Sequence, residues 1–267
     1  DGDFVLHSLS GGLRENMVPE AGRAVFSGPA DLAFLQEKLV AFTAENPVTA
    51  SLTEEAGRFQ LEVIGKSAHG ASPASGINGV TYLANFLSQF DFAGPAQAYL
   101  TIAGQILHQD HFGQATGVAY EDEKMGKLTM NAGVFSFDAA SSDNRIALNF
   151  RFPQGTDEKK IQAVLEGLEG VREVSLSQHM HTPHYTPMED ELVSTLLSVY
   201  EKQTGLKGHE QIIGGGTFGR LLKRGVAFGA MFPGYTDTMH QANEFADVED
   251  LYRAAAIYAE AIYELIK

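Results

Sequence analysis

The sequence predicts a mixed α/β or α+β fold, and two features of its pattern carry this prediction. Along the chain, segments with apolar residues at helical spacing are interleaved with segments in which apolar and polar residues alternate one by one. Of the 267 residues, 44% are hydrophobic, which is enough for a sizeable core in one large domain or two unequal domains. We expect two domains, with the boundary in residues 182–187, where two prolines interrupt any regular element.

The first expected domain contains helices and strands that are separated by turn signals. Apolar residues at helical spacing predict a helix over residues 30–46, and strict alternation predicts a half-buried strand over 58–66. A glycine-rich loop over 65–79 follows. The later predicted elements are helices over 80–92 and 97–112, paired antiparallel strands over 127–138 and 145–153, a helix over 158–168 with Asp157 as its cap, and a strand over 171–179.

The second expected domain has a more regular alternation of helices and strands. Its last helix, over residues 248–266, has one apolar stripe formed by Leu251, Ala255, Tyr258, Ile262 and Leu265. The other predicted elements are a helix over 191–204, a strand over 210–213, a short helix that ends at Arg224 and a strand over 226–232. These roughly 80 residues are few for an independent core, so we expect their sheet to need strands from another part of the protein.

Charge and composition exclude several classes of partner. The formal net charge is −15 and the 19 Lys and Arg residues are scattered, so we expect neither nucleic acid nor a membrane surface as a partner. No apolar run approaches the roughly 18 residues that a bilayer span needs. The absence of cysteine excludes disulfides, thiolate metal sites and a cysteine nucleophile, and it favours a cytoplasmic location.

Two histidine clusters are candidates for metal ligands. His179 and His181 share a face of a predicted strand and His184 follows closely, so they can bind zinc or form a polar strand end. No carboxylate stands at ligand spacing beside this cluster, which favours the metal-free interpretation. His108 and His111 are three residues apart on a predicted helix, where a solvated face is favoured over a metal site.

Two further histidines lie in segments suited to a binding site. His69 follows a strand in a loop of small residues, where a substrate can approach the backbone and an imidazole can donate to a developing oxyanion. A loop histidine without a role remains the alternative. His240 lies in a polar stretch after a predicted strand, at an edge where α/β sheets bind ligands. Alone it is fewer than the roughly three protein ligands that a catalytic zinc needs.

A glycine turn and one arginine complete the candidates. Gly214, Gly215 and Gly216 precede a short helix, and their backbone N–H groups can bind a carboxylate or a tetrahedral intermediate. The lysine of a phosphate-binding loop is missing from this turn. Arg151 interrupts an aromatic strand, where its guanidinium can pair with a substrate carboxylate or with an internal acidic side chain.

Five motifs, in order along the chain, give it a resemblance to a known enzyme family. They are Ser67 to Pro73, Asn149 to Asp157, Gly208 to Arg220, Arg224 to Gly229 and His240 to Glu244. Together they resemble the PepV-type dipeptidases, the Xaa-His or carnosinase-like branch of the dinuclear zinc aminopeptidase and aminoacylase clan.

The resemblance implies a zinc-aminopeptidase-like α/β catalytic domain with a ferredoxin-like α+β lid inserted into it. It assigns residues 1–183 to the lid and 184–267 to the carboxy-terminal segment of the catalytic domain. The implied activity is hydrolysis of dipeptides with a free amino terminus, by a water that two zinc ions and a Glu activate. The implied site residues are His240 as a zinc ligand, His69 as the imidazole that polarises the scissile carbonyl, and Asn16, Arg151 and the Gly214, Gly215 and Gly216 backbone as substrate contacts.

The chain departs from this family in one large respect. The family's other zinc ligands and its catalytic Glu belong to an upstream segment, and no His-x-Asp pair stands in a suitable context in this sequence. We therefore expect position 1 to be a cut inside a longer protein, and the chain alone neither to hold two zinc ions nor to hydrolyse peptides. A metal-free peptide-binding or partner-binding module that retained the lid is the alternative. The enlarged lid of this branch favours a monomer.

Overall fold

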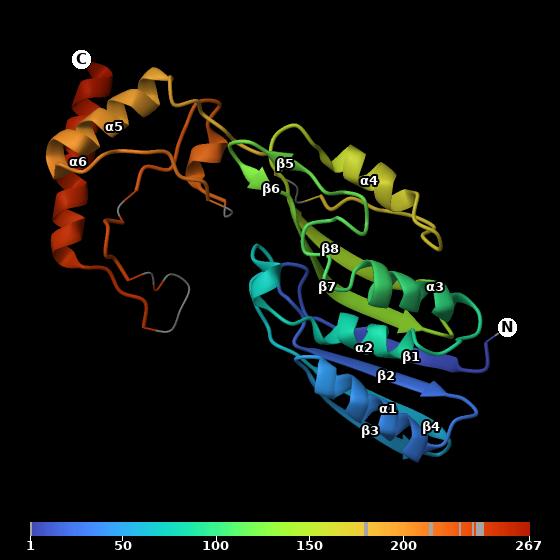
Figure 1. Cartoon of the computed structure of the whole chain (residues 1–267). Coiled ribbons are helices and arrows are strands. Elements are labelled where there is room, and N and C mark those ends of the chain that lie inside the picture. Colours follow the sequence, from blue (N-terminus) through green and yellow to red (C-terminus); the bar gives the residue numbers. More distant parts are fainter. Residues whose placement is uncertain (1, 179–180, 214–215, 230, 237, 239–242) are drawn as a thin grey trace. The chain divides into compact units, whose positions relative to one another are not determined.

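The chain divides into two units of unequal size, Asp1–Pro183 and His184–Lys267 (Figure 1). The computed structural model describes residues 2–178, 181–213, 216–229, 231–236, 238 and 243–267. The predicted mixed α/β class is confirmed, because the first unit contains a six-stranded sheet covered by helices. No helix within the described ranges combines the length and the apolar character that a bilayer crossing requires.

The sheet of the first unit has the strand order β3-β4-β2-β1-β7-β8, and all neighbouring strands are antiparallel. β2 and β3 both pair with β4 and so run in the same direction, joined through helix α1 as in the split βαβ unit of ferredoxin-like folds. A separate ribbon pairs β5 with β6. The strands are β1 Val5–Gly11, β2 Ala21–Ser27, β3 Thr49–Glu55, β4 Arg58–Ile64, β5 Glu121–Asp122, β6 Gly126–Lys127, β7 Thr129–Asp138 and β8 Arg145–Arg151.

Helices α1 and α2 lie over one face of this sheet (Figure 1). Asp31 caps α1 by accepting from the Phe34 N–H, and Asn78 caps α2 in the same way. Asp157 caps α4, as the sequence predicts. The helices of this unit are α1 Leu32–Glu45, α2 Gly79–Leu87, α3 Pro95–Thr101 and α4 Glu158–Glu166, with a one-turn 3₁₀ helix η1 at Pro73–Ser75 and a π-helix η2 at Ile102–Ile106.

The core of the first unit lies between the sheet and these helices. Every second residue of β2 and β4 faces it, so Phe26, Leu61 and Val63 are buried while their neighbours along the strands are exposed or half-buried. Helix α1 contributes Leu35 to the same cluster. This packing fixes the end of β4, and with it the start of the loop that carries His69.

The described residues of the second unit form two long helices, α5 (Glu191–Thr204) and α6 (Val248–Ile266), and a short 3₁₀ helix η3 (Phe218–Leu221). The bounds of α5 and α6 agree with the sequence prediction. Leu196 and Val199 of α5 pack with Ile257 of α6 in a small separate core. Gly205 ends α5 in the left-handed conformation, with φ 69°, that favours glycine.

Three strands predicted from the sequence do not form in the described residues, and these predictions are wrong. Residues 171–178, 210–213 and 226–229 with 231–232 lie outside any strand. An alternating apolar pattern is not sufficient, because a strand also needs a hydrogen-bonding neighbour. For the two segments that lie in the second unit, its described part contains no strand that could serve as that neighbour.

The apolar stripe predicted for the last helix is not its buried face. Leu251 and Ile262 are 53% and 59% exposed, whereas Ala254, Ile257 and Ala261 are at most 3% exposed. The small alanine side chains allow α5 to approach α6 closely, so the neighbouring helix selects a face beside the larger apolar residues. The larger residues are left on the surface of this unit.

Candidate substrate-binding site

Two segments that are far apart in the sequence meet beside the sheet of the first unit. The N–H of Gly70 donates to the carbonyl oxygen of Asn16 at 2.7 Å. The next residue of the first segment, Met17, forms an antiparallel bridge with His69. Asn16 and His69, which the resemblance implies as substrate contacts, therefore lie on two paired stretches of backbone.

The loop that carries His69 is closed at its base and packed tightly at its tip. Lys66 and Ile77 exchange two backbone hydrogen bonds of 2.8 Å, which close the loop. A Cβ atom at Gly70 would stand 2.8 Å from the carbonyl carbon and oxygen of Asn16. Glycine is thus required at this position for the two segments to approach one another.

The His69 ring is exposed and has a defined pattern of donor and acceptor atoms. The N–H of Ala71 donates to Nδ1 of His69 at 3.0 Å. Because Nδ1 accepts this bond, the proton of the neutral imidazole lies on Nε2, where it can be donated to a substrate oxygen. The role of His69 in polarising a carbonyl group stays a prediction, and this proton position is compatible with it.

Arg151 lies in a row of polar side chains at one end of β7 and β8. In the register of this pair, Arg151 is opposite Thr129 and Asn149 is opposite Asn131. Side chains alternate along a strand, so these four residues share one face. The Thr129 hydroxyl and the Asn149 side-chain oxygen are buried without a hydrogen-bond partner among the described residues. Of these four residues, the sequence analysis singled out only Arg151. The other three join it through the pairing register of β7 and β8, which the sequence does not show.

A polar cavity of about 240 Å³ lies next to the paired segments. Its lining includes Val18, Asn78, Asp110, His111 and Asn131. Asp110 uses both carboxylate oxygens within the first unit, accepting from the N–H groups of residues 114 and 116 at 2.7 and 3.0 Å. The Asp110 carboxylate is therefore already engaged by groups of the first unit.

His108 and His111 do not lie on a solvated helical face, and this interpretation of the sequence is wrong. The predicted helix over 97–112 ends with the π-helix at Ile106, so both histidines lie beyond it. The His108 ring packs edge-on against Tyr82 with 4.5 Å between ring centroids, and burial lowers its pKa to about 4. Burial also lowers the pKa of His111.

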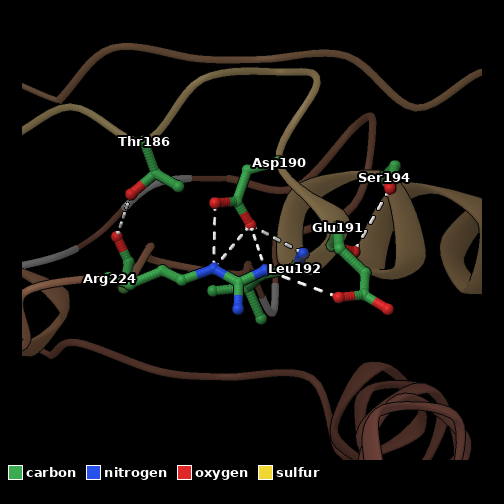
Figure 2. Close-up of polar contacts among 7 residues, drawn as sticks. Thr186, Asp190, Glu191, Leu192, Ser194 and Arg224 are labelled. Carbon is green, nitrogen blue, oxygen red and sulfur yellow. Dashed lines mark hydrogen bonds and ion pairs between the residues drawn. The ribbon is translucent and has the colours of Figure 1, made fainter.

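In the second unit, a group of polar contacts anchors the segment around Arg224 (Figure 2). Asp190 caps α5 by accepting from the Leu192 N–H at 2.8 Å, and it accepts two bonds of 2.8 and 2.9 Å from Nε of Arg224. Thr186 donates to the Gly225 carbonyl oxygen at 2.8 Å. The hydrogen bond from the Arg224 guanidinium is the main reason why the pKa of the Asp190 carboxyl lies below its usual range.

Most candidate residues of the second unit lie outside the described residues. One histidine of the cluster His179, His181 and His184 also lies outside them. The residues outside are Gly214, Gly215, His240 and His179. Gly216 is described, and a Cβ atom there would overlap the guanidinium of Arg220. The His184 ring contacts the Gly225 carbonyl oxygen at 2.6 Å. Within the described ranges, no three His, Asp or Glu side chains come together as a metal site.

The first unit is thus a mixed α/β fold. In its site, the loop that carries the His69 imidazole is paired with the segment that carries Asn16. An imidazole donor held in this way is suited to binding a polarised carbonyl group. The profile of Peptidase family M20/M25/M40 matches residues 3–264, and the chain belongs to this family. The resemblance carried by the five motifs is thereby confirmed at the level of the family.

Curated relatives of the chain are named as dipeptidases. The chain is 41% identical over 267 residues to Beta-Ala-Xaa dipeptidase of Lactobacillus delbrueckii subsp. lactis, a match that covers 100% of the chain and 56% of the relative. It is 36% identical over 265 residues to the protein named "Putative dipeptidase YtjP" of Bacillus subtilis (strain 168). This match covers 98% of the chain and 56% of the relative. The chain thus spans somewhat more than half the length of these relatives.

Proposed function

We propose that the chain is part of a dipeptidase, with its first unit as the substrate-binding lid and its second unit as the carboxy-terminal segment of the catalytic domain. Membership of the peptidase family and the names of the relatives support this proposal. The single observation that carries it is the pairing of the segments of Asn16 and His69, because it brings two expected substrate contacts together.

The proposed substrate is a dipeptide with a free amino terminus, and each expected contact has a chemical role. Nε2 of His69 donates to the oxygen of the scissile carbonyl and stabilises the negative charge that develops there. The guanidinium of Arg151 pairs with the terminal carboxylate, for which its planar fork is suited. The Asn16 side chain and the N–H groups of Gly214 to Gly216 hold the substrate backbone.

We propose two zinc ions as the metal centre of the full-length enzyme, with His240 as one ligand. The described residues do not assemble a ligand set for zinc. We propose that the other ligands belong to the part of the relatives' length that the chain does not span. The exposed Leu251 and Ile262 of α6 support a further protein contact for the second unit. A cytoplasmic location and a monomeric state stay predictions.

The test of the proposed function uses the protein of the full reading frame, assayed for hydrolysis of β-alanyl-histidine and of an α-dipeptide. We expect His69→Gln to lower kcat by a factor on the order of 10² to 10³, as loss of an oxyanion donor does. His7→Gln is the matched control, because His7 is a second imidazole of the same unit, near the start of β1, where its ring contacts Ser27 at 2.9 Å. A kcat that His69→Gln leaves unchanged would remove the role assigned to His69.

The chain by itself gives a second test, through its metal content and its activity. We expect fewer than two equivalents of zinc by elemental analysis and no hydrolysis, because the proposal places most zinc ligands outside this chain. Two bound equivalents together with dipeptide cleavage would contradict the division of the ligands proposed above. Dipeptide binding without hydrolysis by the full-length protein would favour a peptide-binding module instead.

A further inference from the structure

Asn131 is a buried residue of β7 whose side chain contacts the segment of Asn16. It is 2% exposed. Its Nδ2 group donates to the carbonyl oxygen of Glu15 at 2.6 Å and to that of Met17 at 2.9 Å. An asparagine amide has two N–H donors, so both are used on the carbonyl groups on either side of Asn16.

Three successive carbonyl groups of this segment are thereby held from two sides. Asn131 binds the outer two, and the N–H of Gly70 binds the middle one, that of Asn16. The bridge between Met17 and His69 continues this pairing into the loop. Asn131 is therefore connected to both expected substrate contacts through a short series of backbone contacts.

The strand that carries Asn131 lies unusually close to this segment. Gly12 has φ +86° and lies against Gly133, and a Cβ atom at Gly133 would overlap the backbone of Glu15. The β7–β8 register shifts at Gly133, a type of irregularity that changes the direction of neighbouring side chains. The two glycines set the distance between strand and segment, and the Asn131 amide fixes the segment at that distance.

We propose that Asn131 is a positioning residue of the active site, which holds Asn16 and His69 in their relative geometry without contacting the substrate. The inference rests on the proposed function, because it needs these two residues to act on a substrate. Without the amide, the carbonyl groups of Glu15 and Met17 lose their donor and the segment shifts. A shift of about 1 Å at a reacting centre lowers the rate by a factor on the order of 10².

The test compares Asn131→Ala with Asn85→Ala in the protein of the full reading frame. Asn85 is the matched control, because its Nδ2 also donates to a backbone carbonyl, that of Gly104 at 2.7 Å, in the same unit. We expect kcat/KM to fall on the order of 10²-fold in Asn131→Ala and to stay close to wild type in Asn85→Ala. Most of the loss is expected in kcat, since His69 acts on the charge of the transition state.

Hydrogen exchange of the Gly70 and Val18 amides separates this inference from the proposed function. Both amides donate across the pairing of the two segments. We expect both to lose protection in Asn131→Ala and to keep it in Asn85→Ala. Unchanged protection overturns the positioning by Asn131. If the Gly70 and Val18 amides lose protection in Asn131→Ala but kcat is unchanged, the paired segments have no catalytic role. The proposal that Asn131 positions the active site is then overturned as well.

A second variant, Asn131→Ser, keeps the test decisive if Asn131→Ala does not fold. The serine hydroxyl supplies one donor in place of two. We expect a loss of Gly70 protection and of kcat/KM relative to wild type, with the circular dichroism of the folded protein retained. Wild-type values of both quantities in Asn131→Ser overturn the proposal.

Discussion

The Gly70→Ala substitution tests the pairing of the Asn16 and His69 segments through a single methyl group. The added Cβ would stand 2.8 Å from the carbonyl carbon and oxygen of Asn16, which are backbone atoms and cannot rotate away. To move from 2.8 Å to the 3.4 Å of an ordinary contact, the Asn16 segment must retreat by about 0.6 Å. The 2.7 Å hydrogen bond between the two residues then lengthens beyond the usual range.

Two costs add in the folded state of Gly70→Ala. The lost hydrogen bond contributes about 0.5–1.5 kcal/mol, and the crowded contact contributes about 1–3 kcal/mol. We therefore expect the free energy of unfolding of the first unit to fall by about 1.5–4.5 kcal/mol. Since each kcal/mol shifts the midpoint of a domain of this size by roughly 2–4 °C, the midpoint falls by at least about 3 °C.

The assay is calorimetric unfolding of the chain, with Gly167→Ala as the matched control. Gly167 follows α4 with φ −78°, a conformation that alanine adopts without strain. The same added methyl group is therefore expected to be neutral or to stabilise by about 0.4–1 kcal/mol. An unchanged midpoint in Gly70→Ala, or an equal loss in both variants, would refute the steric reasoning.

Two further predictions concern a helix cap and a buried imidazole. Asp157→Ala removes the acceptor of the Lys160 N–H at 2.9 Å, so urea unfolding should show a loss of about 0.5–2 kcal/mol, which Asp157→Asn should largely avoid. Burial lowers the pKa of His108 from 6.5 to about 4, so its contribution to stability is fully present above pH 6.5 and is lost as the pH falls towards 4. Between pH 7 and pH 4, wild type should lose about 3 kcal/mol more than His108→Gln, and equal losses would contradict the assigned burial.

Local signals in the sequence predicted the helices of this protein well. The bounds of α5 and α6 and the capping by Asp157 agree with the structure, because a helix makes its backbone hydrogen bonds within its own segment. The antiparallel pairing of β7 and β8 was also predictable, since a short turn connects the two strands. Where the sequence prediction is wrong, as for residues 226–232, an apolar segment has no neighbouring strand in the described residues.

By itself, the sequence determined the fold class, most helices and the membership of a peptidase family, which the comparisons confirmed. It also singled out His69 and Arg151 as individual residues. The tertiary structure alone decided that Asn16 and His69 lie on paired backbone and that Asn131 holds one of these segments. The physical reason is distance along the chain: Asn131 is 116 and 114 residues from its two hydrogen-bond partners, and no local pattern encodes such a contact.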